Sequence, residues 1–94
     1  MKQKIIITLE KRKEKLRKMD VKEIGLFGSY LKNKQKRGSD IDFLVTFDKI
    51  SSKNYFGLIF YLENLFKRKV DLVIKQDLKP ELNYVKKEAI YVRI

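Results

Sequence analysis

Two short stretches of the chain carry residue types from which catalysis can be built. Asp40 and Asp42 stand one residue apart at the start of an apolar segment, and Gly28-Ser29 precedes them by ten intervening residues. Residues i and i+2 of an extended strand point the same way, so both carboxylates are expected on one face. Neighbouring carboxylates raise each other's pKa unless a cation lies between them, and Mg²⁺ prefers such oxygen ligands. The pair therefore predicts a magnesium site.

A third candidate carboxylate, Asp71, interrupts the apolar segment 70–74. A charge inside an apolar strand is costly without a partner or a metal ion. If this segment pairs beside residues 40–47, Asp71 joins the face of Asp40 and Asp42. Three carboxylates could then hold two Mg²⁺ ions for in-line displacement at phosphorus, and one of them could accept the proton of the attacking hydroxyl.

The Gly28-Ser29 turn is a candidate phosphate-binding element. It follows a predicted strand; glycine lets the backbone approach a phosphate, and the N–H groups and the serine hydroxyl can bind its oxygens. The sequence has no GxxxxGK[ST] motif, so this is not a P-loop. Each feature alone is weak, since most D-x-D pairs are solvated and most Gly-Ser pairs are plain turns. Their order and spacing make the combined pattern informative.

The composition narrows the chemistry further. The chain has 94 residues, enough for one domain spanning 1–94, with neither cysteine nor histidine and a formal net charge of +11. These absences exclude disulfides, thiol catalysis, serine–histidine triads and histidine or cysteine metal sites. No apolar run approaches the roughly 20 residues of a membrane span, so a soluble, cytoplasmic protein without membrane contact is expected. The positive charge predicts attraction to phosphates or to an acidic partner.

The elements that position these residues alternate between helix and strand. Apolar spacing predicts helices over 2–19, 53–67 and 81–89, the second capped by Ser52 and the third preceded by Pro80. Alternating apolar residues predict strands over 22–27, 40–47 and 70–74. Between and after them we expect a short helical turn over 30–33, a basic loop over 34–39 and a strand or a tail over 91–94. This order indicates an α/β (α+β) fold with helices on a small sheet.

The helix over 53–67 carries more apolar residues than one buried stripe requires. Phe56 and Phe60 lie off the stripe, which consists of Tyr55, Leu58, Ile59, Leu62, Leu65 and Phe66. Two interpretations stay open: a thick core helix, or a surface for a partner.

The two motif segments together resemble a known signature. Residues 26–30 and 39–45 are similar to the G-S-x10-D-x-D pattern of DNA polymerase β-like nucleotidyltransferases. In particular the chain resembles the minimal nucleotidyltransferases (MNT), which pair with HEPN-domain proteins in prokaryotic toxin–antitoxin operons. The likeness continues through 70–73 and 78–82 and ends in 88–92, so it covers roughly residues 21–94.

The resemblance implies a polymerase β-like fold, a small mixed β-sheet flanked by helices. It implies that Gly28 and Ser29 hold the triphosphate of ATP. It also implies that Asp40 and Asp42 bind Mg²⁺, while Asp71 completes the metal site and helps to activate the nucleophile. The implied reaction transfers AMP from ATP to a tyrosine hydroxyl of a HEPN toxin, which neutralises this ribonuclease and releases pyrophosphate. The implied assembly is a hetero-oligomer of antitoxin and toxin.

One position departs from the family pattern, which often reads G-S-x-A-R-G. Here Gly28-Ser29 is followed by Tyr-Leu-Lys-Asn, so Lys32 stands at the arginine position and lacks its planar fork. This departure leaves an alternative open, an antitoxin that blocks the toxin by docking alone.

The basic clusters at 11–18, 32–37 and 67–69 suit a solvated face. Lys34, Lys36 and Arg37 are also candidates to face ATP phosphates or the partner, because they lie between the Gly-Ser turn and the predicted metal strand. Direct nucleic-acid binding rests on charge alone, since no aromatic residues interleave with the lysines as in a stacking platform for single strands.

Overall fold

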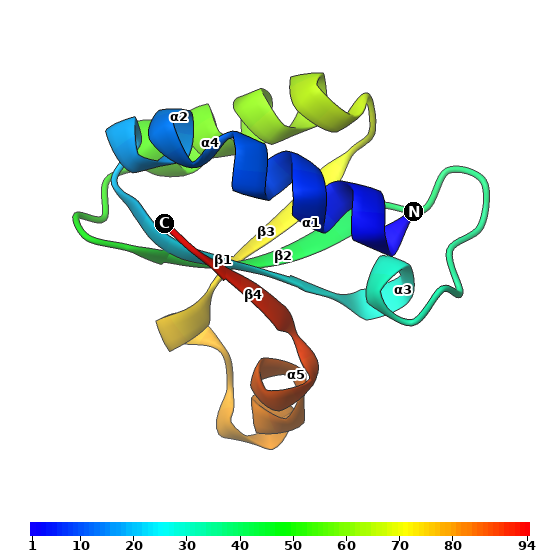
Figure 1. The fold of residues 1–94 in the computed structure, drawn as a ribbon. Helices are drawn as coiled ribbons and strands as arrows, with labels where there is room; N and C mark the ends of the chain where they lie inside the picture. The colour runs from blue at the N-terminus through cyan, green and yellow to red at the C-terminus, as the bar shows by residue number, and fades with distance from the viewer.

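Four strands form one mixed sheet with the order β3-β2-β1-β4 (Figure 1). The structure, a computed structural model, describes all 94 residues, and its strands are β1 Val21–Phe27, β2 Ile41–Phe47, β3 Val70–Ile74 and β4 Ile90–Arg93. β1 lies antiparallel to both β2 and β4, whereas β3 runs parallel to β2. The mixed sheet flanked by helices is thereby confirmed, and the last residues form a strand rather than a tail.

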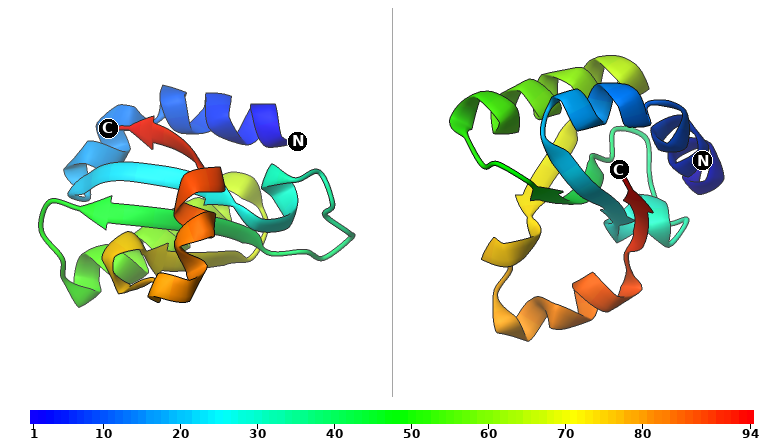
Figure 2. Two further views of the ribbon diagram at one scale, coloured as in Figure 1. Left: turned by 90° about the horizontal axis from the view of Figure 1, so that it is seen from below. Right: turned by 60° about the vertical axis from the view of Figure 1, so that its left-hand side comes forward.

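The helices divide between the two faces of this sheet. They are α1 Lys2–Lys11, α2 Lys13–Lys18, α3 Gly28–Leu31, α4 Ser52–Phe66 and α5 Asn83–Glu88. Helices α1, α2 and α4 cover one face, while two 3₁₀ turns (Lys75–Asp77 and Pro80–Leu82) and α5 pass beneath the other (Figures 1 and 2). We call residues 75–89 the C-terminal crossover. None of the helices combines the length and apolar character needed to cross a membrane.

The core lies between the sheet and helices α1, α2 and α4. Alternate residues of β2 point into it and meet buried side chains of the helices: Ile41, Phe43, Val45 and Phe47 from the strand, and Ile5, Leu9, Leu16, Leu58 and Leu62 from the helices. Because side chains alternate along a strand, the intervening residues of β2, Asp42 among them, face the opposite side of the sheet.

That opposite face is covered only in part. Leu44, which alternation places among the outward residues, is nonetheless buried, outside the main core cluster. Its cross-strand neighbour Gly25 lies under the Tyr91 ring, so close that a Cβ there would stand 2.7 Å from ring atoms. The missing side chain at Gly25 therefore lets Tyr91 pack against the sheet next to Leu44.

Two of the predicted helices differ from the observed ones at particular residues. The helix predicted over 2–19 breaks at Arg12 (φ −110°, ψ 17°), where the apolar stripe has an exposed charge and no buried contact to hold the helix. Helix α4 is capped by Ser51 and not by Ser52. Ser51 has the extended backbone that an N-cap requires, and its Oγ accepts a hydrogen bond from the N–H of Asn54 at 3.1 Å.

The last predicted helix, over 81–89, is shorter than expected. A 3₁₀ turn at Pro80–Leu82 is followed by the six residues of α5, and no side chain in either is buried. Without a buried face, packing does not stabilise a longer helix. The helical turn expected over 30–33 begins two residues earlier, at Gly28.

Candidate active site

The sheet brings the Gly28 turn and two of the aspartates together at one edge. Because β1 and β2 are antiparallel, the last residue of β1, Phe27, pairs with Asp42 near the start of β2. Because β3 runs parallel to β2, Asp71 pairs with Asp42 from the other side. The pairing expected for the strand of Asp71 is thus confirmed. Asp40 lies immediately before β2 and is exposed.

Gly28 is required by both its backbone and its surroundings. Its φ of 77° lies in the left-handed region that glycine adopts at little cost. A Cβ at this position would also stand 2.9 Å from Cγ and 3.1 Å from Cβ of Asp42. The turn can approach the Asp42 carboxylate only because residue 28 has no side chain. Ser29 follows it at the start of α3 and is half-buried.

Asp42 has the most perturbed acidity in the chain. It is half-buried, and its pKa is raised from 3.8 to about 6. Burial is the largest cause; the negative charges of Asp71 and then Asp40 follow, and a hydrogen bond with Asp71 adds to them. The carboxyl groups of Asp42 and Asp71, carried by paired residues of β2 and β3, therefore oppose each other's ionisation.

These residues fit a magnesium site in their chemistry, although the structure holds no preformed cluster. No group of three or more His, Cys, Asp or Glu side chains is arranged to hold an ion. Asp40 and Asp71 are exposed, so their side chains can move apart as like charges do. All the donors are carboxylate oxygens. Burial and then the repulsion from Asp71 and Asp40 raise the pKa of Asp42, and a hard cation would relieve this repulsion.

Lys32, at the arginine position of the family pattern, is held by the C-terminal crossover. Its Nζ lies 3.4 Å from Oε2 of Glu88, the last residue of α5, and both side chains are about half exposed. Such a pair contributes little to stability. No local pattern links Glu88 to the Gly-Ser turn, so sequence reasoning had no signal for this contact.

Two of the basic clusters meet in space. Lys36 and Arg37 of the loop over 34–39 line a groove of about 450 Å³ together with Arg68, which precedes β3; the other lining residues are Met1, Tyr30, Gln35 and Gly38. The loop is held by two hydrogen bonds, from the N–H of Lys36 to Ser39 Oγ at 2.8 Å and from the N–H of Ser39 to the carbonyl of Lys36 at 3.0 Å. No carboxylate lines this groove, so it favours anions.

Comparison with known proteins gives a consistent result. The nucleotidyltransferase domain family matches residues 7–93. The chain is 43% identical over 89 residues to the protein adenylyltransferase MntA of Thermococcus cleftensis, and this match spans 93% of the chain and 89% of the relative.

Solved structures share the fold. A chain of a toxin–antitoxin complex with AMP-PNP is 26% identical with a TM-score of 0.68, covering 96% of this chain and 70% of that one. A chain of the complex between tri-AMPylated HEPN toxin and MNT antitoxin of Shewanella oneidensis is 23% identical with a TM-score of 0.64, covering 97% and 71%. At the lower identity the likeness concerns the fold alone.

Proposed function

This chain belongs to the nucleotidyltransferase domain family and, within it, to the protein adenylyltransferases, and we propose that it transfers AMP from ATP to a tyrosine hydroxyl of a HEPN-domain toxin. The modification neutralises the toxin, which makes this chain the antitoxin of a hetero-oligomeric pair. The 43% identity to a protein adenylyltransferase supports a protein acceptor. The G-S-x10-D-x-D resemblance supports the HEPN partner. We place the reaction in the cytoplasm, where the ATP that it consumes is held.

The observation that carries this proposal is the position of Asp42. It lies between the Gly28 turn on one side and Asp71 on the other, and its pKa is raised by burial and by the charges around it. Gly28 and Ser29 are positioned to bind the phosphates of ATP, whose α-phosphorus would then lie near the three carboxylates. The acceptor hydroxyl would approach from the side of Asp71, because the Gly28 turn occupies the other side of Asp42.

In the proposed reaction the tyrosine oxygen attacks the α-phosphorus of ATP. The bond from this phosphorus to the oxygen that bridges to the β-phosphate breaks, and pyrophosphate leaves. Asp71, paired with Asp42, accepts the proton of the tyrosine hydroxyl and holds it as a carboxylic acid. We assign Asp40, Asp42 and Asp71 as the residues that would hold Mg²⁺, and the ion would supply charge neutralisation at the phosphates.

The direct test incubates this chain with a HEPN-domain toxin, ATP and MgCl₂ and measures AMP transfer from the intact mass of the toxin. We expect mass increments of AMP with the natural chain and none with Asp42→Asn. Asp48→Asn is the matched control, because Asp48 is an exposed aspartate directly after the far end of β2. A HEPN protein that stays unmodified with the natural chain and several divalent metals would exclude the transfer reaction.

One contact favours a second candidate, in which the chain neutralises the toxin by docking alone. Lys32 is the cation that the family pattern places near the nucleotide, and here it is paired with Glu88. On this alternative, Asp42→Asn would still protect cells that express the toxin. On the proposed function, the same variant would lose protection.

A further inference from the structure

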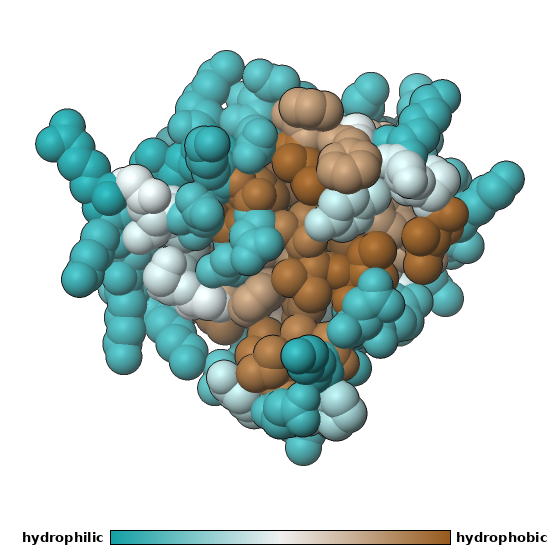
Figure 3. All heavy atoms as spheres, turned by 180° about the vertical axis from the view of Figure 1, so that it is seen from behind, coloured by the Kyte–Doolittle hydropathy of each residue, from teal (hydrophilic) through white to brown (hydrophobic).

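A second surface of the molecule is apolar without being part of the core. Helix α4 exposes two phenylalanines one turn apart, Phe56 at 56% and Phe60 at 66% exposure, and Ile50 before the helix is also exposed. From behind, apolar side chains gather over α4 and β3, within a frame of hydrophilic ones (Figure 3). A monomer has no structural need to leave two phenylalanines in water, so this surface points to an interaction.

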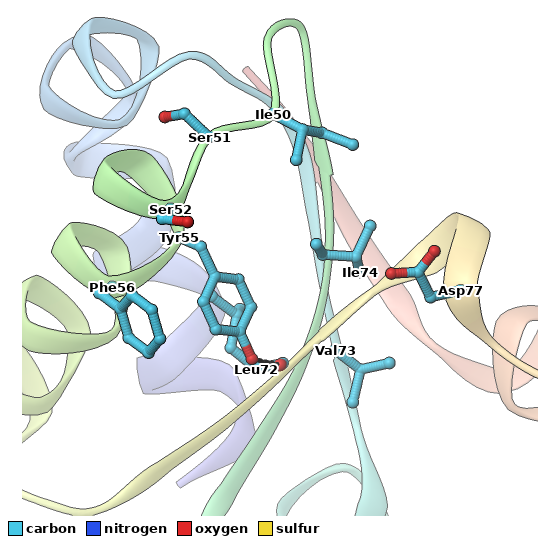
Figure 4. Close-up of a pocket in the computed structure, with 9 residues that line it drawn as sticks. All are labelled: Ile50, Ser51, Ser52, Tyr55, Phe56, Leu72, Val73, Ile74 and Asp77. Carbon is cyan, nitrogen blue, oxygen red and sulfur yellow. Dashed lines mark hydrogen bonds between the residues drawn. The ribbon is translucent and has the colours of Figure 1, made fainter.

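The surface is hollowed into a groove of about 410 Å³ between α4 and β3. It is lined by Ile50, Ser51, Ser52, Tyr55, Phe56, Leu72, Val73, Ile74 and Asp77 (Figure 4). The rings of Tyr55 and Phe56 meet edge to face, with centroids 5.2 Å apart. We call this the α4–β3 groove.

The groove is built to receive side chains rather than an added strand. β3 is an edge strand, and an edge carbonyl is where another chain could pair. The carbonyl of Leu72 is instead occupied by Tyr55, whose Oη donates a hydrogen bond to it at 2.7 Å (Figure 4). A helix that lays its apolar face into the groove meets no such obstacle.

The groove and the carboxylates share the edge strand β3 but face different sides of the sheet. Its floor, Leu72–Ile74, follows Asp71 directly along β3, and each strand residue adds about 3.3 Å. The opposite flank of Asp42 is closed by the Gly28 turn. A protein seated in the groove therefore lies against the strand that carries Asp71.

The charges around the groove indicate the nature of the occupant. The only charged residue in its lining is Asp77. Two exposed cations adjoin the lining in the chain, Lys49 before Ile50 and Lys53 after Ser52, and the exposed Asp48 precedes Lys49. A partner surface with an apolar centre and acidic flanks complements this arrangement.

We propose that the α4–β3 groove docks the protein acceptor itself, through an apolar helix flanked by acidic residues, and holds it against β3, the strand that carries Asp71. This rests on the proposed function for the identity of the acceptor. Buried aromatic anchors carry most of the affinity of an interface. Phe56 in the groove lining, and Phe60 one turn further along α4 beside that lining, should therefore determine how tightly the acceptor binds.

The test uses the full chain with Phe60→Glu or Phe56→Glu. Both residues are exposed, so neither change should lower the melting temperature. We expect at least a tenfold rise in KM for the HEPN protein in AMP transfer, and the same rise in Kd by calorimetry. The kcat at saturating acceptor and the affinity for ATP should stay unchanged. Ile7→Glu is the matched control, because Ile7 is a similarly exposed apolar residue on a different helix, α1.

The outcomes separate the two proposals. If both phenylalanine variants keep the KM and Kd of the natural chain, the groove is not the docking site, whether or not the chain transfers AMP. If the natural chain transfers no AMP but its HEPN complex is lost in Phe60→Glu, the groove stands and the proposed reaction fails. Phe60→Lys should weaken binding less than Phe60→Glu, and the reverse order would overturn the acidic partner. A change of oligomeric state of the isolated chain in Phe60→Glu would assign the groove to a second copy of this chain instead.

Discussion

The two faces of the sheet carry different kinds of residue, and one strand supplies both. Toward α1, α2 and α4, β2 contributes only buried apolar side chains, and no polar or charged residue of the chain is buried. Toward the C-terminal crossover the same strand presents Asp42 beside Asp71. Close like charges oppose folding, so the apolar face must hold the strand in place. The comparison teaches that the carboxylate edge, the strand ends that carry Asp42 and Asp71, depends on the apolar packing on the opposite face of the sheet.

The largest difference between the two faces is expected in stability. Phe43→Ala removes a fully buried ring from the helix-covered side and should lower the free energy of unfolding by about 3–5 kcal/mol. Thr46→Ala, on the same strand but facing the other way, should cost less than about 1 kcal/mol. Urea denaturation measures both. Equal losses would show that the crossover side packs as firmly as the helical side.

Gly28→Ala should lower the rate of AMP transfer more than it lowers stability. The added methyl group pushes against the Asp42 carboxylate, and a displacement of about 1 Å near reacting groups can lower the rate about 10²-fold. The positive φ adds a stability cost of about 1–2 kcal/mol. Gly57→Ala on α4 is the control, because nothing lies within 4 Å of its added Cβ; that variant should bind ATP normally and gain about 0.5–1 kcal/mol. Unchanged AMP transfer in Gly28→Ala would contradict the close approach.

The charge on the carboxylate edge predicts a pH-dependent effect on stability. Without a divalent cation, the folded-state pKa of Asp42 is about 6, above its ordinary value of 3.8, so the folded chain binds this proton more tightly than the unfolded chain. The contribution of Asp42 to stability therefore falls as pH rises from about 4 to about 6 and stays low above that. In metal-free buffer at pH 7.5, Asp42→Asn should melt at a higher temperature than the natural chain, and the gap should close near pH 4.

Adding magnesium to the same melting experiment tests whether the ion binds at Asp42. Adding MgCl₂ at pH 7.5 should raise the melting temperature of the natural chain, and at pH 5 the rise should shrink, because the proton competes with the ion. Asp42→Asn should respond weakly at both values. A magnesium effect that is the same in the natural chain and the variant would place the ion elsewhere.

The smallest expected effect concerns the ion pair between Lys32, which follows α3, and Glu88 of the C-terminal crossover. Glu88→Gln should change the free energy of unfolding by less than about 0.5 kcal/mol, because its ion pair with Lys32 is largely exposed. The same change releases Lys32 toward ATP and should tighten ATP binding about twofold, the factor that corresponds to such an energy. Glu81→Gln, an exposed carboxylate of the crossover, is the control. Identical ATP affinities in the two variants would show that Lys32 does not reach the nucleotide.

Much of the carboxylate edge could be predicted from the sequence because its determinants are local. Period-two alternation over residues 40–47 separates Phe43 from Asp42 without any knowledge of the fold, and β3 forms over 70–74 as expected. The roles of Gly28, Ser29 and the three aspartates in metal and nucleotide binding stay predictions. The predictions were wrong where tertiary contacts set the bounds of a helix. The examples are the break at Arg12, the N-cap at Ser51, and α5, which is short because it has no buried side chain.

By itself, the sequence determined which residues are available for chemistry. With no histidine or cysteine, only carboxylates, hydroxyl groups and cations remain, and the spacing from Gly28-Ser29 to Asp40 and Asp42 already indicates phosphate and metal. Only the tertiary structure decided which of them meet, because strand pairing joins residues far apart in the chain. It placed Asp71 beside Asp42, Glu88 next to Lys32, and the exposed Phe56 along the groove between α4 and β3.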